Sequence, residues 1–274
     1  MKKHGTTVIL LIVLIAGLSL LLYPTLANWW NSMTQSRAVA SYVEAVAQID
    51  DEQYARLWNE ALEYNRSLTS RDNDYLLNQE QKATYEEILD IGGLGIMGYI
   101  EVPSIGVTLP IYHGTDETVL QVAIGHLEWT SLPVGGENSH CVVSGHRGLP
   151  SAKLFTDLDK VVVGDVFIFR VLDEILTYEV DQILIVEPHE TKDLHIEKGE
   201  DLCTLITCTP YGVNSHRLLV RGHRVENAEE AVTVRVTADA TQIEPTIVAP
   251  ILAIPMLLVL LIGLLIPKPR RRFD

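Results

Sequence analysis

Two long apolar runs lie near the ends of this chain of 274 residues. Residues 6–23 and 246–266, runs of 18 and 21 positions, contain no charged side chain, and a helix of about 20 apolar residues crosses a bilayer. Lys2 and Lys3 precede the first run, and Lys268 and three arginines at 270–272 follow the second. The positive-inside rule therefore places both termini in the cytoplasm and the residues between the runs outside. The first run also fits a cleaved signal peptide, but we favour an uncleaved membrane anchor.

The chain that follows the first run has a helical pattern. Over residues 32–63 apolar side chains recur at spacings of three and four, which predicts an amphipathic helix. Residues 65–77 are polar and predict a loop. Residues 79–91 predict a short helix that ends at Gly92-Gly93. The apolar stripe of the first helix is predicted to contain Val39, Tyr42, Val43, Val46 and Ile49.

From residue 96 onward the pattern is that of β-strands. In residues 175–186, Leu176, Tyr178 and Val180 alternate with polar positions, which is typical of a strand with one buried face. Many short strands separated by turns favour a mainly β fold, a closed barrel with a few helices. The remaining expectations are strands at 98–103, 106–112, 139–145 and 165–172, short helices at 115–123 and 152–158, and a last strand or a linker at 225–245.

Residues 201–224 predict two antiparallel strands joined by a loop. The segment Thr204-Leu-Ile-Thr207 favours a strand, and Pro210 and Gly212 end it. Antiparallel pairing would place Cys208 opposite Arg217, since cross-strand neighbours lie about 4.5–5.5 Å apart at Cβ. A thiol beside a fixed positive charge is a candidate nucleophile, because the thiolate is the reactive form of cysteine.

Charge and cysteine content narrow the class of protein. The 21 basic and 36 acidic residues give a net charge of −15. Six of the basic residues and one of the acidic residues lie at the two ends, which leaves 15 basic and 35 acidic residues in the middle. This acidic excess argues against nucleic-acid binding, which needs a basic face. Cys141, Cys203 and Cys208 have no Cys-x-x-Cys spacing, so neither a zinc site nor a disulfide framework is predicted. Cys141 and Cys203 are expected to be core thiols, and no metal or cofactor is expected.

The sequence around Cys208 resembles the active-site signature of sortases. Thr204-Leu-Ile-Thr-Cys208, with Arg217 nine residues later, matches their Thr-Leu-x-Thr-Cys pattern. The longer run Cys-Thr-Pro-Tyr-Gly-Val-Asn-Ser-His-Arg is similar to the pilus-assembling class C branch. Ser144-Gly-His146-Arg-Gly148 matches the sortase histidine motif, and the resemblance covers about residues 95–224. It implies an eight-stranded sortase-like barrel, here with N-terminal helices and a transmembrane helix at each end.

The resemblance also implies a role for three residues. Cys208 would carry the acyl group as a thioester, and His146 would protonate the leaving amine and later deprotonate the incoming amine. Arg217 would bind the substrate carbonyl or stabilise the oxyanion. No acidic residue has a motif that makes it a third member orienting His146. The rival candidates for the role of His146 are His126, His216 and His223, and those for the role of Arg217 are Arg221 and Arg224; all five are set aside.

Residues 65–77 resemble the lid that covers the active site of class C sortases. Asp74-Tyr75 is the nearest match to the Asp-Pro-aromatic lid motif, although the proline is absent. On this hypothesis Asp74 pairs near Arg217 and Tyr75 lies near Cys208. The alternative is a plain solvated connection.

The resemblance, with the two apolar runs, implies a membrane-anchored cysteine transpeptidase on a Gram-positive cell surface. It would cleave a Leu-Pro-x-Thr-Gly-like sorting signal and transfer the acyl group to a lysine amine of a pilin subunit. A housekeeping-type sortase, which attaches surface proteins to peptidoglycan, and a non-catalytic membrane scaffold are the alternatives. The expected organisation is an anchor or signal (1–30), a helical segment with a lid-like loop (31–94), the catalytic barrel (95–230), a linker (231–245), a second transmembrane helix (246–267) and a basic cytoplasmic tail (268–274).

Overall fold

The computed structural model describes residues 5–68 and 77–227. The lid residues Asp74 and Tyr75, the linker, the second transmembrane helix and the basic tail lie outside these ranges. Residues up to Ala27 form one compact unit, and the described residues from Asn28 onward form another. The helices are α1 (Gly5–Val46), α2 (Asp51–Leu68), α3 (Gln79–Glu87) and α4 (Glu117–Leu120), with 3-10 turns η1 (Pro103–Ile105), η2 (Leu158–Lys160) and η3 (Lys192–Leu194).

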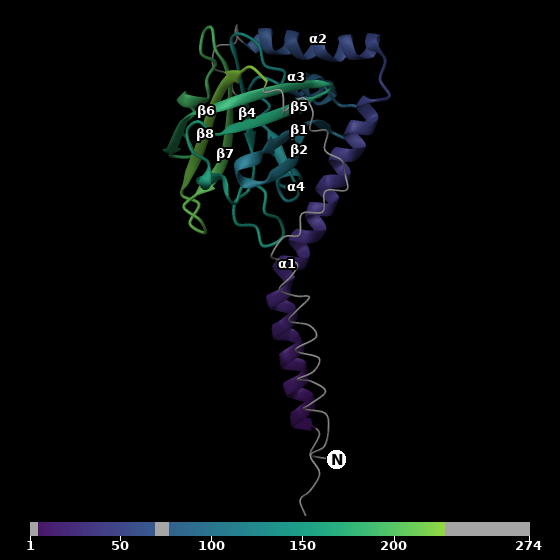
Figure 1. The fold of residues 1–274 in the computed structure, drawn as a ribbon, viewed down its shortest axis with the longest axis vertical. Helices are drawn as coiled ribbons and strands as arrows, with labels where there is room; N and C mark the ends of the chain where they lie inside the picture. The colour runs from purple at the N-terminus through teal and green to yellow at the C-terminus, as the bar shows by residue number, and fades with distance from the viewer. Residues whose placement is uncertain (1–4, 69–76, 228–274) are drawn as a thin grey trace, which may run out of the picture. The chain divides into compact units, whose positions relative to one another are not determined.

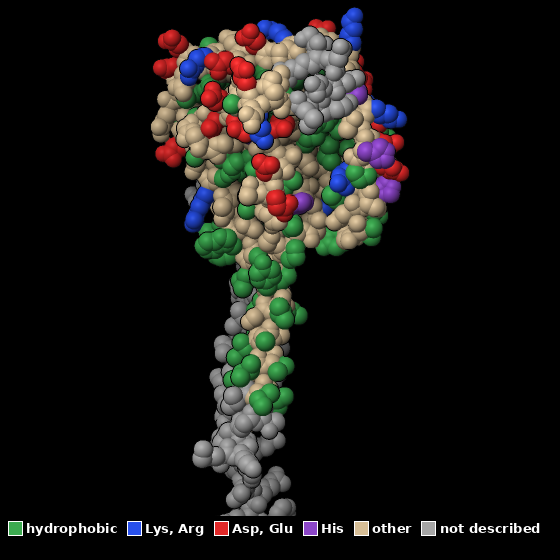
Figure 2. Space-filling model, turned by 180° about the vertical axis from the view of Figure 1, so that it is seen from behind, with side chains coloured by type: hydrophobic (Ala, Val, Ile, Leu, Met, Phe, Trp, Pro, Cys, Tyr) green, Lys and Arg blue, Asp and Glu red, His purple; other side chains and the backbone are tan. Residues whose placement is uncertain are grey.

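The first part of α1 has the properties of a membrane span. Within the described residues, α1 is the one helix long and apolar enough to cross a bilayer. Its most apolar window has a mean hydropathy of 2.5, and none of that window is buried. Hydrophobic side chains line the face of this part of the helix that is visible in the space-filling view (Figure 2), which supports membrane anchoring.

Eight strands close into a barrel, as the sequence predicts. Their order around the barrel is β1-β2-β3-β4-β7-β8-β6-β5, and β5 pairs with β1 to complete the circle (Figure 1). Most neighbours are antiparallel, but β2 with β3 and β4 with β7 run parallel. The strands are β1 (Ile96–Val102), β2 (Val107–His113), β3 (Ile124–His126), β4 (Ser139–Ser144), β5 (Val166–Val171), β6 (Glu174–Val186), β7 (Asp201–Thr209) and β8 (His216–Val225).

The two faces of the sheet bury different clusters. The inward side chains of every strand join one large core, to which β7 contributes Cys203 and Leu205. On the other face a smaller group forms, which we call the outer cluster. Because successive strand residues point to opposite faces, the outer cluster shows which positions of β4, β7 and β8 face outward. Its buried members are Val142, Val186, Leu194, Ile206 and Leu219.

The second part of α1 and α2 pack on the barrel. Tyr42 is buried, accepts a hydrogen bond from the Leu172 amide at 2.8 Å and donates one to the Met97 carbonyl at 3.1 Å. Val39 and Val46 join the core as predicted, whereas Val43 is exposed. The predicted single helix over 32–63 is interrupted at residues 47–50, where the Asp50 side chain accepts a hydrogen bond from the Gln53 amide at the start of α2.

Two other local predictions are wrong. Asn65 and the residues up to Leu68 belong to α2, not to a loop, and Asn65 is buried. Residues 152–157 form turns instead of a helix, and only η2 follows them. Phe155 and Leu158 of this segment are fully buried in the core, so tertiary packing decides its path over its helical pattern.

Candidate active site

Cys208 lies one residue before the end of β7, and His146 lies two residues after the end of the adjacent strand β4, which runs in the same direction. In the β4–β7 pair, Ser144 lies opposite Ile206, and each chain continues two residues further to His146 and Cys208. The Gly145 amide donates to the Ile206 carbonyl at 3.0 Å, so the pairing continues past the end of β4. Thr207 adds a second link, since its hydroxyl donates to the Gly145 carbonyl at 2.8 Å. Neighbouring strands are about 4.8 Å apart, and the two side chains therefore start from neighbouring positions.

Alternation places both side chains on the outer face. Val142 on β4 and Ile206 on β7 belong to the outer cluster, and His146 and Cys208 lie an even number of residues beyond them. Gly145 faces the core, because a Cβ there would lie 2.8 Å from Phe155 and 2.9 Å from Ile124. A glycine at this position therefore lets β4 approach the core just before His146.

Arg217 lies on the third strand of the same group. It is the register partner of Cys208 in the β7–β8 pair, as the sequence predicts. Its Nη1 donates to the carbonyls of Asn214 and His216, at 3.3 and 3.1 Å. Leu219 of the outer cluster lies two residues further along β8, which places Arg217 on the outer face beside Cys208. The strand pairing thus brings the backbone positions of Cys208 and Arg217 opposite one another, and His146 follows the strand on the other side of β7.

Glu117 is an acidic residue near His146 that the sequence does not single out. Its Oε2 lies 3.9 Å from the imidazole Nε2, although the Glu117 side chain is 72% exposed. His146 Nε2 itself is inaccessible and has no hydrogen-bond partner within the described residues. The distance allows an ion pair with protonated His146 but no direct hydrogen bond. Glu117 is the first residue of the short helix α4, 29 positions before His146, so no local motif connects the two.

The other cysteines lie inside the barrel, as predicted. Cys141 and Cys203 are register partners on β4 and β7, and both are buried in the core. Burial opposes ionisation of Cys141, but its hydrogen bonds with Cys203 and His126 lower its pKa. Neither sulfur is accessible to a substrate, whereas Cys208 is partly exposed.

The rival histidine and arginine residues have other contacts. His126 is fully buried and lies 2.9 Å from the Tyr85 hydroxyl through Nδ1. Arg221 pairs with Asp181 and Glu197, and Arg224 lies over the ring of Tyr178 and donates to the Ile175 carbonyl. These contacts give them structural roles.

A cleft of about 460 Å³ adjoins the candidate site behind the β7–β8 hairpin. Thr209 and Leu218 line it, and they alternate with Cys208 and Arg217, so the cleft opens on the opposite side of the hairpin. Arg147 also lines the cleft, where it pairs with Asp159 and lies 5.9 Å from the centre of the Tyr211 ring. Cys208 is not among the lining residues.

Within the described residues, no group of three or more potential metal ligands comes together. The carboxylate of Glu101 on β1 pairs with Arg170 at 2.8 Å.

Comparison with known proteins identifies relatives of one family. A sortase domain model matches residues 100–225. Sortase D of Bacillus subtilis is 30% identical over 131 residues, which are 47% of this chain and 63% of that protein, so the match spans less than two thirds of the relative. Two solved structures match more of the chain. Sortase C1 of Streptococcus agalactiae is 50% identical, with a TM-score of 0.69, and the match covers 70% of this chain and 100% of that one. Sortase C of Streptococcus pneumoniae, whose structure is described as informative on pilin substrate specificity, is 43% identical with a TM-score of 0.64 over 70% of this chain and 97% of that one.

Proposed function

The chain belongs to the sortase family, and we propose that it is a membrane-anchored cysteine transpeptidase of the pilus-assembling class C branch. The observation that carries the proposal is the register of three adjacent strands, which places Cys208 opposite Arg217 and Ser144, two residues before His146, opposite Ile206, two residues before Cys208. The identities of 50% and 43% to class C structures favour this branch over a housekeeping sortase. The substrate is a protein that carries a Leu-Pro-x-Thr-Gly-like sorting signal.

In the first half of the reaction Cys208 attacks the carbonyl carbon of the Thr residue, at the Thr–Gly peptide bond of the signal. The thiolate forms the new C–S bond, the carbonyl oxygen becomes negatively charged, and the C–N bond then breaks. His146, as imidazolium, gives its proton to the leaving glycine amine. The products of this step are a thioester on Cys208 and a neutral imidazole.

The second half releases the acyl group to an amine. A lysine ε-amine of another pilin subunit attacks the thioester, and His146 removes a proton from it. The C–S bond breaks, an isopeptide bond remains, and Cys208 leaves as the thiolate. His146 thus alternates between acid and base, and the Glu117 carboxylate lies 3.9 Å from its Nε2.

Arg217 stabilises the negative charge that forms on the carbonyl oxygen in both halves. A guanidinium remains protonated, so it acts through charge and hydrogen bonds and not as a base. The carbonyls of Asn214 and His216 accept from its Nη1 and hold the group at the start of β8. Its other N–H groups remain to donate to the oxyanion, and a donor fixed before the reaction stabilises the transition state most effectively.

The acidic charge and the apolar helix favour a location at the outer surface of the membrane. The first part of α1 anchors the chain, and acidic side chains are spread over the face of the domain seen in Figure 2. The second span and the orientation of the two termini remain predictions from residues 246–274 and from Lys2 and Lys3.

The test is to trap the thioester with the full chain in detergent micelles. We expect a peptide with the sorting signal to form a hydroxylamine-sensitive adduct on Cys208, detected by mass spectrometry of the digested protein. Cys208→Ala should abolish the adduct, and Cys203→Ala, the matched control, should retain it. An adduct on Cys141 or Cys203 would refute the assignment.

The acceptor separates the two branches of the family. A peptide with the acceptor lysine of a pilin and a peptidoglycan-derived amine are offered to the preformed thioester. We expect the lysine peptide to resolve it faster. A preference for the peptidoglycan amine would instead assign the chain to the housekeeping branch.

A further inference from the structure

One face of α1 changes character between Asn28 and Val46. Residues that are not exposed recur along this face at spacings of three and four, as on one side of a helix. Its later members, such as Val39 and Tyr42, are buried in the core. Its earlier members are the partly buried amides Asn28, Asn31 and Gln35. These residues belong to the same compact unit as the barrel, and amide side chains are suited to bind backbone groups there.

Two of these amides hold the loop that follows His146. Asn31 Nδ2 donates to the Ser151 carbonyl at 2.8 Å, and Asn28 Oδ1 accepts from the Lys153 backbone amide at 2.8 Å. A carbonyl can only accept and a backbone N–H can only donate, so the backbone of the loop decides which way each side-chain amide is turned. The two contacts lie 120 and 125 residues apart along the chain, and no local pattern indicates them.

The loop closes on His146 itself. The His146 carbonyl accepts a hydrogen bond from the Phe155 amide at 3.2 Å, and the Gly148 amide donates to the Thr156 hydroxyl at 3.1 Å. Residues 147–154 therefore leave from His146 and return beside it. Phe155 is fully buried, which fixes the returning end in the core. The contacts with α1 fix the part of the loop that lies between these two ends.

The third amide holds the segment that carries Glu117. Gln35 Nε2 donates to the Val122 carbonyl at 2.7 Å. Val122 follows α4, whose first residue is Glu117, the carboxylate 3.9 Å from His146 Nε2. A helix of four residues is not stable by itself, so the position of Glu117 depends on the contacts that hold this segment. One face of α1 thus contacts both the loop that begins at His146 and the segment that carries its acidic neighbour.

We propose that Asn28, Asn31 and Gln35 are positioning residues that hold the loop after His146 and the α4 segment in place, so that the imidazole is set before the sorting peptide binds. This inference rests on the proposed transpeptidase function. Proton transfer needs the imidazole within about 2.6–3.2 Å of the amine, so a displaced His146 slows the chemical steps. The expected effect is on kcat, because the three amides act through His146 and not on the bound peptide.

The same substitution at two positions gives a matched pair of variants of the full chain in detergent micelles. Asn28→Asp keeps an acceptor for the Lys153 amide, whereas Asn31→Asp replaces the donor to the Ser151 carbonyl by a second acceptor. Both variants add one negative charge to the same face of α1. Ser32→Asp adds the same charge on the exposed face and controls for its effect at the membrane. The measurements are hydrogen exchange of amides 148–156 and kcat and KM for cleavage of a sorting peptide.

We expect Asn31→Asp to speed exchange in the loop and to lower kcat about fivefold, with KM within about twofold of wild type, because a carbonyl loses its donor and faces a carboxylate. Asn28→Asp and Ser32→Asp should match the wild type in all three quantities. Gln35→Glu loses its donor in the same way. It should speed exchange of amides 119–123 and also lower kcat, and it decides the matter if Asn31→Asp does not fold.

Three results would overturn the proposal. Loop amides could exchange no faster in Asn31→Asp than in Asn28→Asp; exchange could be faster with kcat unchanged; or the loss could appear in KM alone. If the wild-type chain does not cleave the peptide, the transpeptidase function fails and the positioning role fails with it. The exchange data would then still show whether Asn31 and Gln35 anchor the two segments.

Discussion

Asn65 connects α2 to the segment that leads from β3 to β4, and its replacement tests how much this contact stabilises the domain. Its Nδ2 donates to the Leu132 carbonyl at 3.1 Å, and its Oδ1 accepts from the Leu132 amide at 2.7 Å. Asn65 is 5% exposed and Leu132 is fully buried. Asn65→Ala therefore leaves the buried Leu132 amide without a partner, whereas the Leu132 carbonyl keeps the hydrogen bond that it accepts from the Val134 amide at 2.8 Å.

The two lost hydrogen bonds set the expected magnitude. The buried Leu132 amide left without a partner costs about 1–3 kcal/mol, and loss of the second hydrogen bond, whose carbonyl keeps another donor, costs about 0.5–1.5 kcal/mol. Alanine has a higher helix propensity than asparagine and returns about 0.5 kcal/mol. The expected net loss in the free energy of unfolding is about 1–4 kcal/mol, a large part of the roughly 5–15 kcal/mol of a typical domain.

The measurement is urea denaturation followed by tryptophan fluorescence, with the full chain in detergent micelles. With a slope of about 2 kcal/mol per M, the midpoint should fall by about 0.5–2 M. Asn59→Ala is the matched control, because Asn59 lies on the same helix but is exposed. A loss below about 1 kcal/mol, or one equal to that of the control, would contradict the reasoning.

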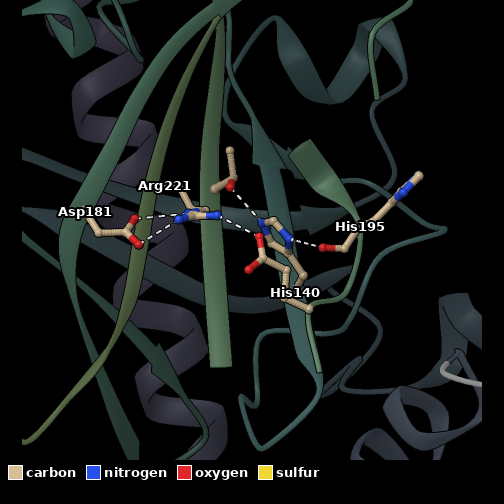
Figure 3. A network of polar contacts seen from close by, with 6 residues as sticks. His140, Asp181, His195 and Arg221 are labelled. Atoms are coloured by element: carbon tan, nitrogen blue, oxygen red, sulfur yellow. Dashed lines mark hydrogen bonds and ion pairs between the residues drawn. The ribbon is translucent and has the colours of Figure 1, made fainter. Parts of the chain in front are cut away.

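The remaining predictions concern a catalytic residue and the effect of pH. Arg217→Lys should lose most of the activity because an ammonium lacks the planar fork of donors; kcat/KM for cleavage of a sorting peptide measures this, and a wild-type value would remove the proposed role of Arg217. Burial lowers the pKa of His140, so the unfolded chain binds more protons than the folded chain below about pH 6.5. The stability that His140 contributes is therefore complete above that pH and is lost as the pH falls through the lowered pKa. The charged groups that act on His140 are Arg221, Glu197 and Asp181 (Figure 3). The urea midpoint should fall less between pH 7.5 and pH 5 in His140→Asn than in the wild type, and equal falls would exclude His140 as the group responsible.

The barrel could be predicted because most of its strands carry their own local signal. Alternation in residues 175–186 and the β-branched run before Cys208 depend only on local sequence, and both segments form strands at the expected places. The opposition of Cys208 and Arg217 could also be predicted, since a hairpin fixes its own register. Strand β3 was missed because its three residues, Ile124–His126, are too few to form a pattern.

Contacts between distant segments could not be predicted. Asn65 is polar and next to other polar residues, which indicates a loop, yet its hydrogen bonds to Leu132 bury it in a helix. Phe155 lies in a segment with a helical pattern, but its burial in the core determines the local path. In both cases the partner lies far away in the sequence or in the folded core, and propensity carries no information about it.

The position of His146 depends on both kinds of information. The motif around it identifies the residue, but a motif does not say which face of a strand it occupies. The parallel pairing of β4 with β7 gives this information. Ser144 opposite Ile206 fixes the position of His146 along the strands, and the alternation of side chains fixes the face of the sheet. A shift of one residue in this register would turn the imidazole to the other side of the sheet. The glycine before His146 and the Thr207 hydrogen bond to its carbonyl hold the register at that point, so these two small residues position the imidazole for the proposed chemistry.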